Sequence, residues 1–413
     1  MTEISTPLAG LDAIDWSELE HAYGPAEDVP AQLRDLCSED AEARGKALHA
    51  LYGNIFHQGS RYKATAAAVP FIARMAADVS LPDRHEYLTM LAALAIGYDE
   101  SHLPAGLDVQ GWRSELEEFR ARAPEEMRAE YDAWVEAASD EGDRRVREMR
   151  RDMFDHERHL EAAEAELAAY DAVRGQVPTL LPLLADVDPA VRAATAYLVA
   201  WFPEEAPDAL LRLLDVLDAE PEPAVLATAL VAAGLLGDAS LVDRLTSFLT
   251  ADEPIVRWAA AIALARLIAT GAECTESVDV LAELAAAQAE PPEAGVPFHG
   301  SDLRGYAASS LTLLADRYPD EALDAVTDGL SATSGPATFP VAEAALKLAF
   351  GEPAPNGLPA FDELTERQQR LIHTLASLGP DTWRWANFWS IVQAWRLPQQ
   401  REEMRAYAGL PHE

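Results

Sequence analysis

The stretch Asp188-Pro189-Ala190-Val191-Arg192 is the first of three related stretches that decide the fold. It recurs as Glu222-Pro223-Ala224-Val225-Leu226 and as Glu253-Pro254-Ile255-Val256-Arg257, so that the three prolines are spaced 34 and 31 residues apart. An acidic residue before proline predicts a helix N-cap, and proline at the first helical position needs no partner for an amide. Each stretch is therefore the predicted start of a helix.

Apolar residues follow each start at helical spacing. After Val191, residues Ala194, Leu198 and Phe202 fall on one face, and the other two stretches continue in the same way. A leucine-rich helix is predicted ahead of each start, at residues 177–184, 208–217 and 241–249. The repeating element is thus an antiparallel helix pair, and the predicted fold class is all-α with pairs stacked side by side.

The same pattern predicts four further helix pairs. They are 29–36 with 41–56, 69–78 with 84–96, 278–289 with 301–316, and 320–330 with 340–350. The expected organisation is an N-terminal cap at 1–28, repeats at 29–99, an inserted element at 100–176, repeats at 177–350 and a helical cap at 351–413.

The Asp-Pro-x-Val-Arg pattern at 188–192, with its Glu-Pro version at 253–257, resembles the start of the second helix in HEAT repeats, of the armadillo-like and PBS-lyase HEAT-like superfamily. The resemblance covers most of residues 29–350 and implies an α-solenoid of about seven HEAT-like helical hairpins. Through Trp16, residues 21–24 and residues 57–59, the chain also resembles actinobacterial HEAT-repeat proteins of unassigned activity. The superfamily includes adaptors, transport factors, bilin lyases and DNA alkylation glycosylases, so the resemblance implies an architecture and no single activity.

Two arginines of the motif, Arg192 and Arg257, are candidate anion ligands. The resemblance to HEAT repeats implies another role, because an arginine at this position usually pairs with an aspartate of the neighbouring repeat. We therefore interpret these arginines as structural, together with the motif residues Asp188, Pro189, Pro223 and Pro254.

The charge of the chain restricts its partners. Its 413 residues include 70 Asp and Glu but only 32 Lys and Arg, which gives a formal charge of −38. A phosphate backbone would be repelled by such a field, so nucleic acid is not the expected partner. Residues 181–320 alone contain 22 acids and 7 arginines, which favours a partner with a basic surface.

The remaining composition is typical of a cytoplasmic protein. Cys37 and Cys274 cannot form a disulfide framework, and neither has neighbours at the spacing of a zinc site. Residues 1–10 lack the features of a secretion signal, and the alanine-rich stretch 258–272 is interrupted by Arg266, so no membrane span is expected.

The inserted element contains a heptad pattern. Its apolar seam, at alternating spacings of three and four, is Val146, Met149, Met153, His156, Leu160, Ala163, Leu167 and Tyr170. The pattern predicts one helix over 140–174, ending near Gly175. Two partners for the seam remain open: the chain's own aromatic helices at 112–134, or a second copy in a homodimer.

The segment from His57 to Tyr62 is the most chemically varied part of the chain. His57, Gln58, Arg61 and Tyr62 lie between two predicted helices, where they could bind an anionic ligand or a partner. The alternative is structural: His57 and Arg61 satisfy carbonyl groups at the end of the preceding helix, and Gly59 ends it.

Tryptophans gather near the C-terminus. Trp383, Trp385, Trp389 and Trp395 follow a helix that the capping box Thr365-x-x-Gln368 is expected to open. Trp385 and Trp389 are candidate binding residues, although large aromatic side chains also suit a cap over the last repeat.

No sequence motif predicts catalysis, a metal or a cofactor. The chain has no glycine-rich phosphate loop and no nucleophile elbow, and His156 and His159 lack the spacing of a zinc protease. With 70 carboxylates, a pair chosen by sequence alone has no meaning.

Three functions are compatible with these features. The first is a non-catalytic scaffold that binds a basic partner on an acidic concave face built from the second helices, together with the inserted helix. The second is a small-molecule binder or an enzyme of the lyase or glycosylase type, with a site near residues 57–62. The third is an acidic inhibitor of immunity type that acts against a basic protein.

Overall fold

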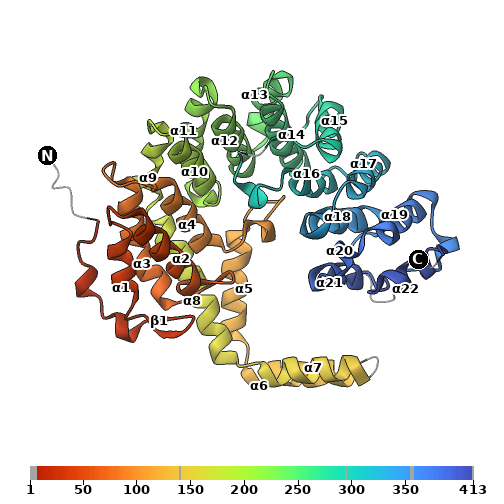
Figure 1. The fold of residues 1–413 in the computed structure, drawn as a ribbon, viewed down its shortest axis with the longest axis horizontal. Helices are drawn as coiled ribbons and strands as arrows, with labels where there is room; N and C mark the ends of the chain where they lie inside the picture. The colour runs from red at the N-terminus through yellow and green to blue at the C-terminus, as the bar shows by residue number, and fades with distance from the viewer. Residues whose placement is uncertain (1–6, 139–140, 294, 354–357, 412–413) are drawn as a thin grey trace. The chain divides into compact units, whose positions relative to one another are not determined.

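The computed structural model describes residues 7–138, 141–293, 295–353 and 358–411, and these are mostly helical (Figure 1). The chain divides into two compact units. Unit 1 comprises residues 1–98 and 108–182, and unit 2 comprises residues 99–107 and 183–413. The predicted all-α fold class is confirmed, although the chain also contains two short β-hairpins that the sequence pattern did not predict.

Unit 1 begins with the 3-10 helices η1 (Leu11–Ala13) and η2 (Trp16–Glu18). Its antiparallel hairpins pair β1 (Glu20–His21) with β2 (Gly24–Pro25) and β3 (Phe56–His57) with β4 (Ser60–Arg61). Its α-helices are α1 (Val29–Asp35), α2 (Ala41–Asn54), α3 (Lys63–Ala77), α4 (Arg84–Ile96), α5 (Val109–Ala121), α6 (Pro124–Glu136), α7 (Glu141–Met153), α8 (His156–Arg174) and α9 (Val177–Leu180). Helix α8 packs on α3, α4 and α5, so the inserted element is part of this unit.

Unit 2 contains the 3-10 helices η3 (Asp99–Ser101), η5 (Pro203–Glu205), η6 (Ala239–Leu241), η7 (Ser247–Thr250), η8 (Phe298–Ser301), η9 (Gly335–Thr338) and η10 (Phe361–Glu363), while η4 (Leu181–Ala185) contains the division between the units. Its α-helices are α10 (Pro189–Val199), α11 (Ala206–Ala219), α12 (Pro223–Leu236), α13 (Val242–Thr246), α14 (Pro254–Ala269), α15 (Ser277–Ala289), α16 (Leu303–Thr312), α17 (Pro319–Ser331), α18 (Phe339–Phe350), α19 (Glu366–Ser377), α20 (Pro380–Trp383), α21 (Ala386–Ala394) and α22 (Arg401–Tyr407).

The helices of unit 2 form two rows. The second helices of the pairs, α10, α12, α14, α16 and α18, pack successively on one another. The first helices, α11, α13, α15 and α17, each pack on the second helix of their own pair (Figure 1). The predicted antiparallel pairs are therefore present, and stacked pairs are the arrangement typical of an α-solenoid.

The three motif stretches start helices as predicted, but only one is capped by its acidic side chain. Asp188 accepts a hydrogen bond from the Ala190 N–H at 2.9 Å. Glu222 and Glu253 occupy the same position before α12 and α14 without a side-chain cap. Aspartate is a preferred N-cap residue because its short side chain reaches the first free amides, whereas glutamate is not. The prediction that all three acids cap their helices is therefore wrong for the two glutamates.

Small residues let the second helices approach closely. At Gly234 in α12, an added Cβ would lie 2.5 Å from both Cα and Cβ of Ala263 in α14. That distance is far shorter than a normal carbon–carbon contact of about 3.5–4.0 Å. The glycine at this position is therefore required by the packing of α12 on α14 and not by its own backbone conformation.

Replacing Gly234 with alanine is expected to destabilise unit 2 by about 1–2 kcal/mol, because the contact with the Ala263 backbone outweighs the higher helix propensity of alanine. Gly45 of α2 is the matched control, since a Cβ there meets nothing within 4 Å. Gly45→Ala should stabilise the protein by about 0.5–1 kcal/mol. Urea unfolding of both variants measures the two signs, and a stabilised Gly234→Ala protein would contradict the close packing.

The single helix predicted over 140–174 is wrong. Helix α7 ends at Met153 and α8 begins at His156, because Asp155 leaves the helical conformation and its side chain accepts a hydrogen bond from the Arg158 N–H at 3.2 Å. The break lets Phe154 pack on Tyr131 of α6, with ring centroids 4.7 Å apart. Helices α6 and α7 pack on each other as a hairpin; residues 139–140 lie outside the described part of the chain.

The heptad seam is divided by this break. In α8, His156 stacks on Phe119 at 4.9 Å, and Tyr170 contacts Trp112 at 5.7 Å, so this half packs on α5 of the same chain. In α7, Val146, Met149 and Met153 are 47%, 55% and 72% exposed. The α7 half of the seam therefore lies on the surface of unit 1.

Candidate functional site

The segment from His57 to Tyr62 forms a tight β-hairpin in unit 1. The strands β3 and β4 are joined by Gln58 and Gly59, which both have positive φ angles, 52° and 88°. This is the backbone conformation of a two-residue hairpin turn, and glycine adopts it without strain. A Cβ at residue 59 would also meet the ring of Tyr98 at 2.9 Å. The turn therefore presses its backbone against an aromatic ring.

Arg61 joins this hairpin to the inserted helix α8. Its side chain is 7% exposed; Nη1 donates to the Gly59 carbonyl, and Nη2 lies 3.3 Å from the Glu166 carboxylate. Burial lowers the pKa of Arg61 and raises that of Glu166, so desolvation outweighs the attraction between them at both groups. The guanidinium thus faces a carboxylate of its own chain, which supports the structural interpretation of Arg61.

His57 and Tyr62 precede and follow Arg61 in the sequence. His57 Nδ1 is 3.0 Å from the Gly53 carbonyl oxygen and 3.3 Å from the Tyr23 hydroxyl. Tyr62 is the N-cap residue of α3, and burial raises the pKa of its hydroxyl. Lys63, the residue after this segment, pairs with Glu161 of α8 at 3.3 Å. Arg61 and Lys63 therefore both contact carboxylates of α8.

Two exposed tyrosines complete this cluster and were missed by the sequence analysis. Tyr23 is 71% exposed and contacts the His57 ring, with centroids 5.3 Å apart. Tyr98 is 54% exposed and contacts Phe56 at 5.6 Å. Exposed aromatic rings are enriched at protein interfaces. Because Tyr23 and Tyr98 are far from the hairpin in sequence, no local pattern indicated that they lie beside it.

The motif arginines connect successive helix pairs. Arg192 binds both carboxylate oxygens of Glu220, each at 2.7 Å. Arg257 contacts Glu283 of α15 at 3.2 Å, and in unit 1 Arg44 contacts Asp83 at 2.8 Å. The partners of Arg192 and Arg257 belong to the next helix pair but are glutamates and not the expected aspartates, whereas Arg44 does contact an aspartate. Pro189, Pro223 and Pro254 begin α10, α12 and α14, respectively.

The acidic residues of unit 2 do not lie on the row where the sequence analysis expected them. The second helices α10, α12, α14 and α16 contain no Asp or Glu, and α18 contains only Glu343. The first helices α11, α13, α15 and α17 contain ten acids and two arginines, Arg212 and Arg244. Because most side chains of the second helices are buried, the charged residues of unit 2 are found on the first helices and in the connections. The predicted acidic face of second helices is therefore wrong.

Two of the four C-terminal tryptophans are buried. Trp383 and Trp395 are 6% and 4% exposed, and the Trp389 indole donates to the Trp383 carbonyl. Trp385 is 37% exposed, contacts Phe339 of α18 and lies under the Arg384 guanidinium. Of the two tryptophans proposed for binding, Trp385 is the more accessible. The predicted capping box of Thr365 and Gln368 opens α19, and this prediction is confirmed.

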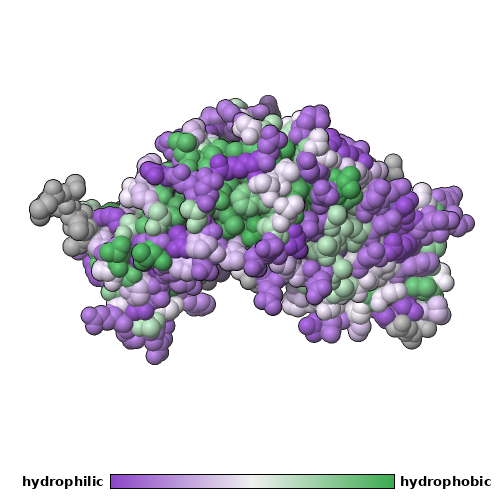
Figure 2. All heavy atoms as spheres, turned by 90° about the horizontal axis from the view of Figure 1, so that it is seen from above, coloured by the Kyte–Doolittle hydropathy of each residue, from purple (hydrophilic) through white to green (hydrophobic). Residues whose placement is uncertain are grey.

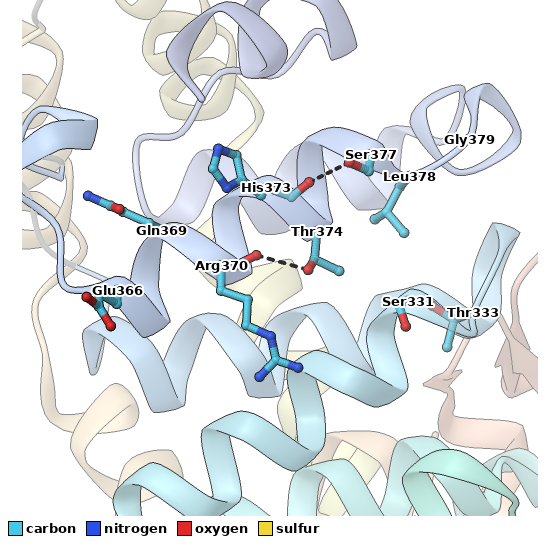
Figure 3. Close-up of a pocket in the computed structure, with 10 residues that line it drawn as sticks. All are labelled: Ser331, Thr333, Glu366, Gln369, Arg370, His373, Thr374, Ser377, Leu378 and Gly379. Carbon is cyan, nitrogen blue, oxygen red and sulfur yellow. Dashed lines mark hydrogen bonds between the residues drawn. The ribbon is translucent and has the colours of Figure 1, made fainter. Parts of the chain in front are cut away.

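A cavity of about 500 Å³ lies between α17 and α19 (Figure 3). Arg370 points from α19 towards α17, where it pairs with Asp324 at 3.2 Å and with Asp328. His373 points away and contacts the Ala408 carbonyl oxygen at 3.1 Å. The hydroxyls of Thr374 and Ser377 donate to backbone carbonyls of their own helix. The polar groups here serve local structure, and the cavity presents no activated nucleophile among the side chains that line it.

The two closely spaced histidines of the inserted element, His156 and His159, do not share a site. His156 stacks on Phe119, whereas His159 Nδ1 lies 2.6 Å from the Asp155 carbonyl oxygen. In the described part of the chain, no three His, Cys, Asp or Glu side chains are placed to hold a metal ion. None of the described helices combines the length and apolar composition that a membrane span requires.

Comparison with known proteins identifies one repeat region. Residues 210–293 match the family described as HEAT repeats. No curated protein matches the chain. Among solved structures, the crystal structure of an engineered protein from a structural genomics consortium aligns with 19% identity over 93% of this chain and 97% of the other, with a TM-score of 0.28. The matched residues run from within α11 to the loop after α15 and include Pro223, Pro254 and Arg257 of the motif, and the chain therefore contains a HEAT-repeat region.

Proposed function

We propose that the protein is a binding scaffold whose HEAT-repeat region docks a partner protein with a basic surface on the first helices α11, α13 and α15. The observation that carries this proposal is the separation of charge in unit 2, where the first helices are acidic and the second helices are not. Stacked helical repeats use extended surfaces to bind other proteins. An acidic row attracts a basic partner and increases its association rate.

The carboxylates of this row are available to a partner. Asp208 and Asp215 of α11, Asp243 of α13 and Asp279 of α15 are exposed, and none has an ion pair within the described residues. By contrast, three of the four acids of α17, Asp320, Asp324 and Asp328, pair with Arg367 and Arg370 of α19. The acidic surface that is available to a partner therefore lies mainly on the part of the row that precedes α17.

Apolar side chains accompany these acids. Leu211 is 65% exposed between Asp208 and Asp215 on one face of α11, and Val278 is 60% exposed beside Asp279. On the face drawn in Figure 2, hydrophobic side chains gather in the middle among hydrophilic ones. Exposed apolar residues with a charged rim are typical of protein interfaces. The partner segment is therefore expected to combine basic and apolar side chains.

The exposed face of α7 offers a second contact surface in unit 1. Val146, Met149 and Met153 follow one another at helical spacing, and Arg145 and Arg150 lie exposed on the same helix. Methionine side chains adapt to different partner surfaces. Insertions that leave the repeat pattern often carry binding specificity.

Replacing Asp208 and Asp215 with asparagine and Leu211 with serine is expected to reduce the association rate of the partner by about tenfold at low ionic strength. The matched control changes two exposed acids of α5, Glu115 and Glu118, to glutamine, which leaves the same net charge. Surface plasmon resonance with the partner captured from native cytosol measures both variants. If the partner associates equally fast at low and high salt, docking on α11 is contradicted. The same holds if both variants slow association equally.

A further inference from the structure

Residues 99–107, here called the strap, fold into unit 2 although they are separated from the rest of it by some 75 residues of unit 1. The strap contacts η8, where His299, Gly300 and Ser301 all have positive φ angles, 56°, 58° and 66°. Such conformations are unfavourable for residues other than glycine and are found where the surrounding structure imposes them. The Asp99 carboxylate of the strap accepts the His299 N–H at 2.8 Å and holds this backbone in place.

His299 is a polar side chain without a polar partner. It is 8% exposed, and its ring stacks on Tyr306 with centroids 6.0 Å apart and an interplanar angle of 17°. Neither imidazole nitrogen has a hydrogen-bond partner within the described residues. Since His299 lines a cavity of about 570 Å³, its imidazole is placed to form a hydrogen bond with a molecule in this cavity.

Two carboxylates face the same cavity from different elements. Glu100 lies on the strap and Glu343 on α18, both exposed to solvent, and neither pairs with a cation of the described chain. The third carboxylate, Asp302, caps α16 through the Gly305 N–H at 2.9 Å. The one lysine of the lining, Lys347, is paired with Glu352 at 2.8 Å. The cavity therefore carries an excess of negative charge.

The remainder of the wall combines apolar groups with the polar side chains of Ser309, Thr312 and Asn387. Leu103 and Pro104 of the strap face the cavity together with Pro336, Phe339 and Pro340 from η9 and α18. A wall of this kind suits a hydrocarbon chain, whereas the carboxylates and the imidazole suit a hydrogen-bond donor with positive charge. A metal ion is not indicated, because the described residues provide no cluster of three ligating side chains.

We infer that this cavity binds a small aliphatic amine. The ammonium group donates to Glu100 or Glu343 and to a nitrogen of His299, and the methylene chain lies against the strap and Phe339. An ammonium ion carries several donors and no acceptor, which matches two exposed carboxylates, Glu100 and Glu343, that have no ion pair within the described chain. An aliphatic diamine satisfies both carboxylates at once.

Isothermal titration calorimetry with cadaverine tests the inference, with 1-pentanol as the uncharged control. We expect saturable binding of one cadaverine per chain at physiological ionic strength and none of pentanol. Glu100→Gln and Glu343→Gln should each weaken binding about tenfold, because each removes a charged hydrogen bond. Glu273→Gln removes an exposed acid of unit 2 outside the cavity and should leave the affinity unchanged.

The His299→Asn variant tests whether the His299 imidazole contacts the amine. Asparagine tolerates a positive φ angle, so the loop is expected to keep its conformation while the imidazole is lost. In histidine-selective NMR spectra, the signal missing from this variant should shift when cadaverine is added to the unaltered protein. Non-saturable binding, or equal effects of Glu100→Gln and Glu273→Gln, would overturn the inference.

A lysine side chain on a partner protein presents the same chemistry. A short lysine-containing peptide that binds in the cavity while cadaverine does not would show that the site is not one for a free amine. These measurements use small probes, so they stand apart from docking of a protein on α11.

Discussion

Replacing Arg192 with alanine is expected to lower the free energy of unfolding of unit 2 by about 2–4 kcal/mol. The guanidinium Nε and Nη2 donate to the two oxygens of Glu220, and Nη1 donates to the Asp186 carbonyl at 2.8 Å. The Glu220 side chain is only 4% exposed, so without Arg192 its charge stays buried with no counter-ion. Burial alone would raise the pKa of Glu220, but the hydrogen bonds from Arg192 and from the Glu222 backbone outweigh it and lower the pKa.

Arg257→Ala is the matched control for this change. Arg257 occupies the same position in a later repeat and also donates to two backbone carbonyls. It differs in its single contact to Glu283, which is 28% exposed and keeps much of its solvation. We expect this variant to lose about 1 kcal/mol.

Urea unfolding, with hydrogen exchange of α10 and α12 as the local readout, measures both variants. The double variant Arg192→Met, Glu220→Leu should recover most of the loss, because an apolar pair of similar size removes the buried charge as well as its partner. Equal effects of Arg192→Ala and Arg257→Ala would mean that the backbone contacts, and not the buried ion pair, determine the role of this position.

The helix pairs were predictable because their signals are local. Pro189, Pro223 and Pro254 begin their helices, and the apolar stripe after each proline is buried in the row of second helices. The same local pattern failed at Asp155, where the heptad spacing continued through a capped helix start. A periodic apolar pattern does not distinguish one long helix from two, because both present the same face.

The distribution of charge required the structure. The composition showed that residues 181–320 are acidic. It could not show that α12 and α14 are too buried to contain any of these acidic residues. The candidate residues His57 and Arg61 were found because the segment is chemically varied, whereas their contacts with Tyr23 and Glu166 cross large sequence separations. The contact of Asp99 with His299 spans 200 residues, and no sequence motif indicated it.

The stability of the strap is expected to fall as the pH rises from 4 to 8, because the Asp99 carboxyl is easier to bury as the neutral acid. Burial is the largest cause of the raised pKa of Asp99, about 7 against an ordinary 3.8, and the neighbouring Glu100 adds to it. Hydrogen bonds from the His299 backbone and the Tyr197 hydroxyl act in the opposite direction without cancelling it. Tyr306, with Arg266 beside it, is the other titratable neighbour.

The direction of this dependence of stability on pH follows from the number of protons that the folded and unfolded states bind. Between the ordinary pKa of 3.8 and the folded value of about 7, the folded protein holds a proton on Asp99 that the unfolded chain releases. The stabilisation is fully present below pH 3.8 and is lost as the pH rises through 7. The difference amounts to about 4 kcal/mol for a shift of this size.

Asp99→Asn removes the ionisation and keeps an oxygen that can accept from His299 and Tyr197. Below pH 3.8 the variant should match the unaltered protein. As the pH rises towards 8 it should become progressively more stable than the unaltered protein, because no carboxylate is left to bury. Hydrogen exchange of peptides covering residues 96–107 and 297–302 measures the local opening at each pH. Glu273→Gln controls for the general loss of one negative charge and should change nothing in these peptides. A variant whose strap opens more readily than the unaltered protein at pH 8 would show that Asp99 is held there as a stabilising carboxylate, and the expected dependence on pH would then have the opposite sign.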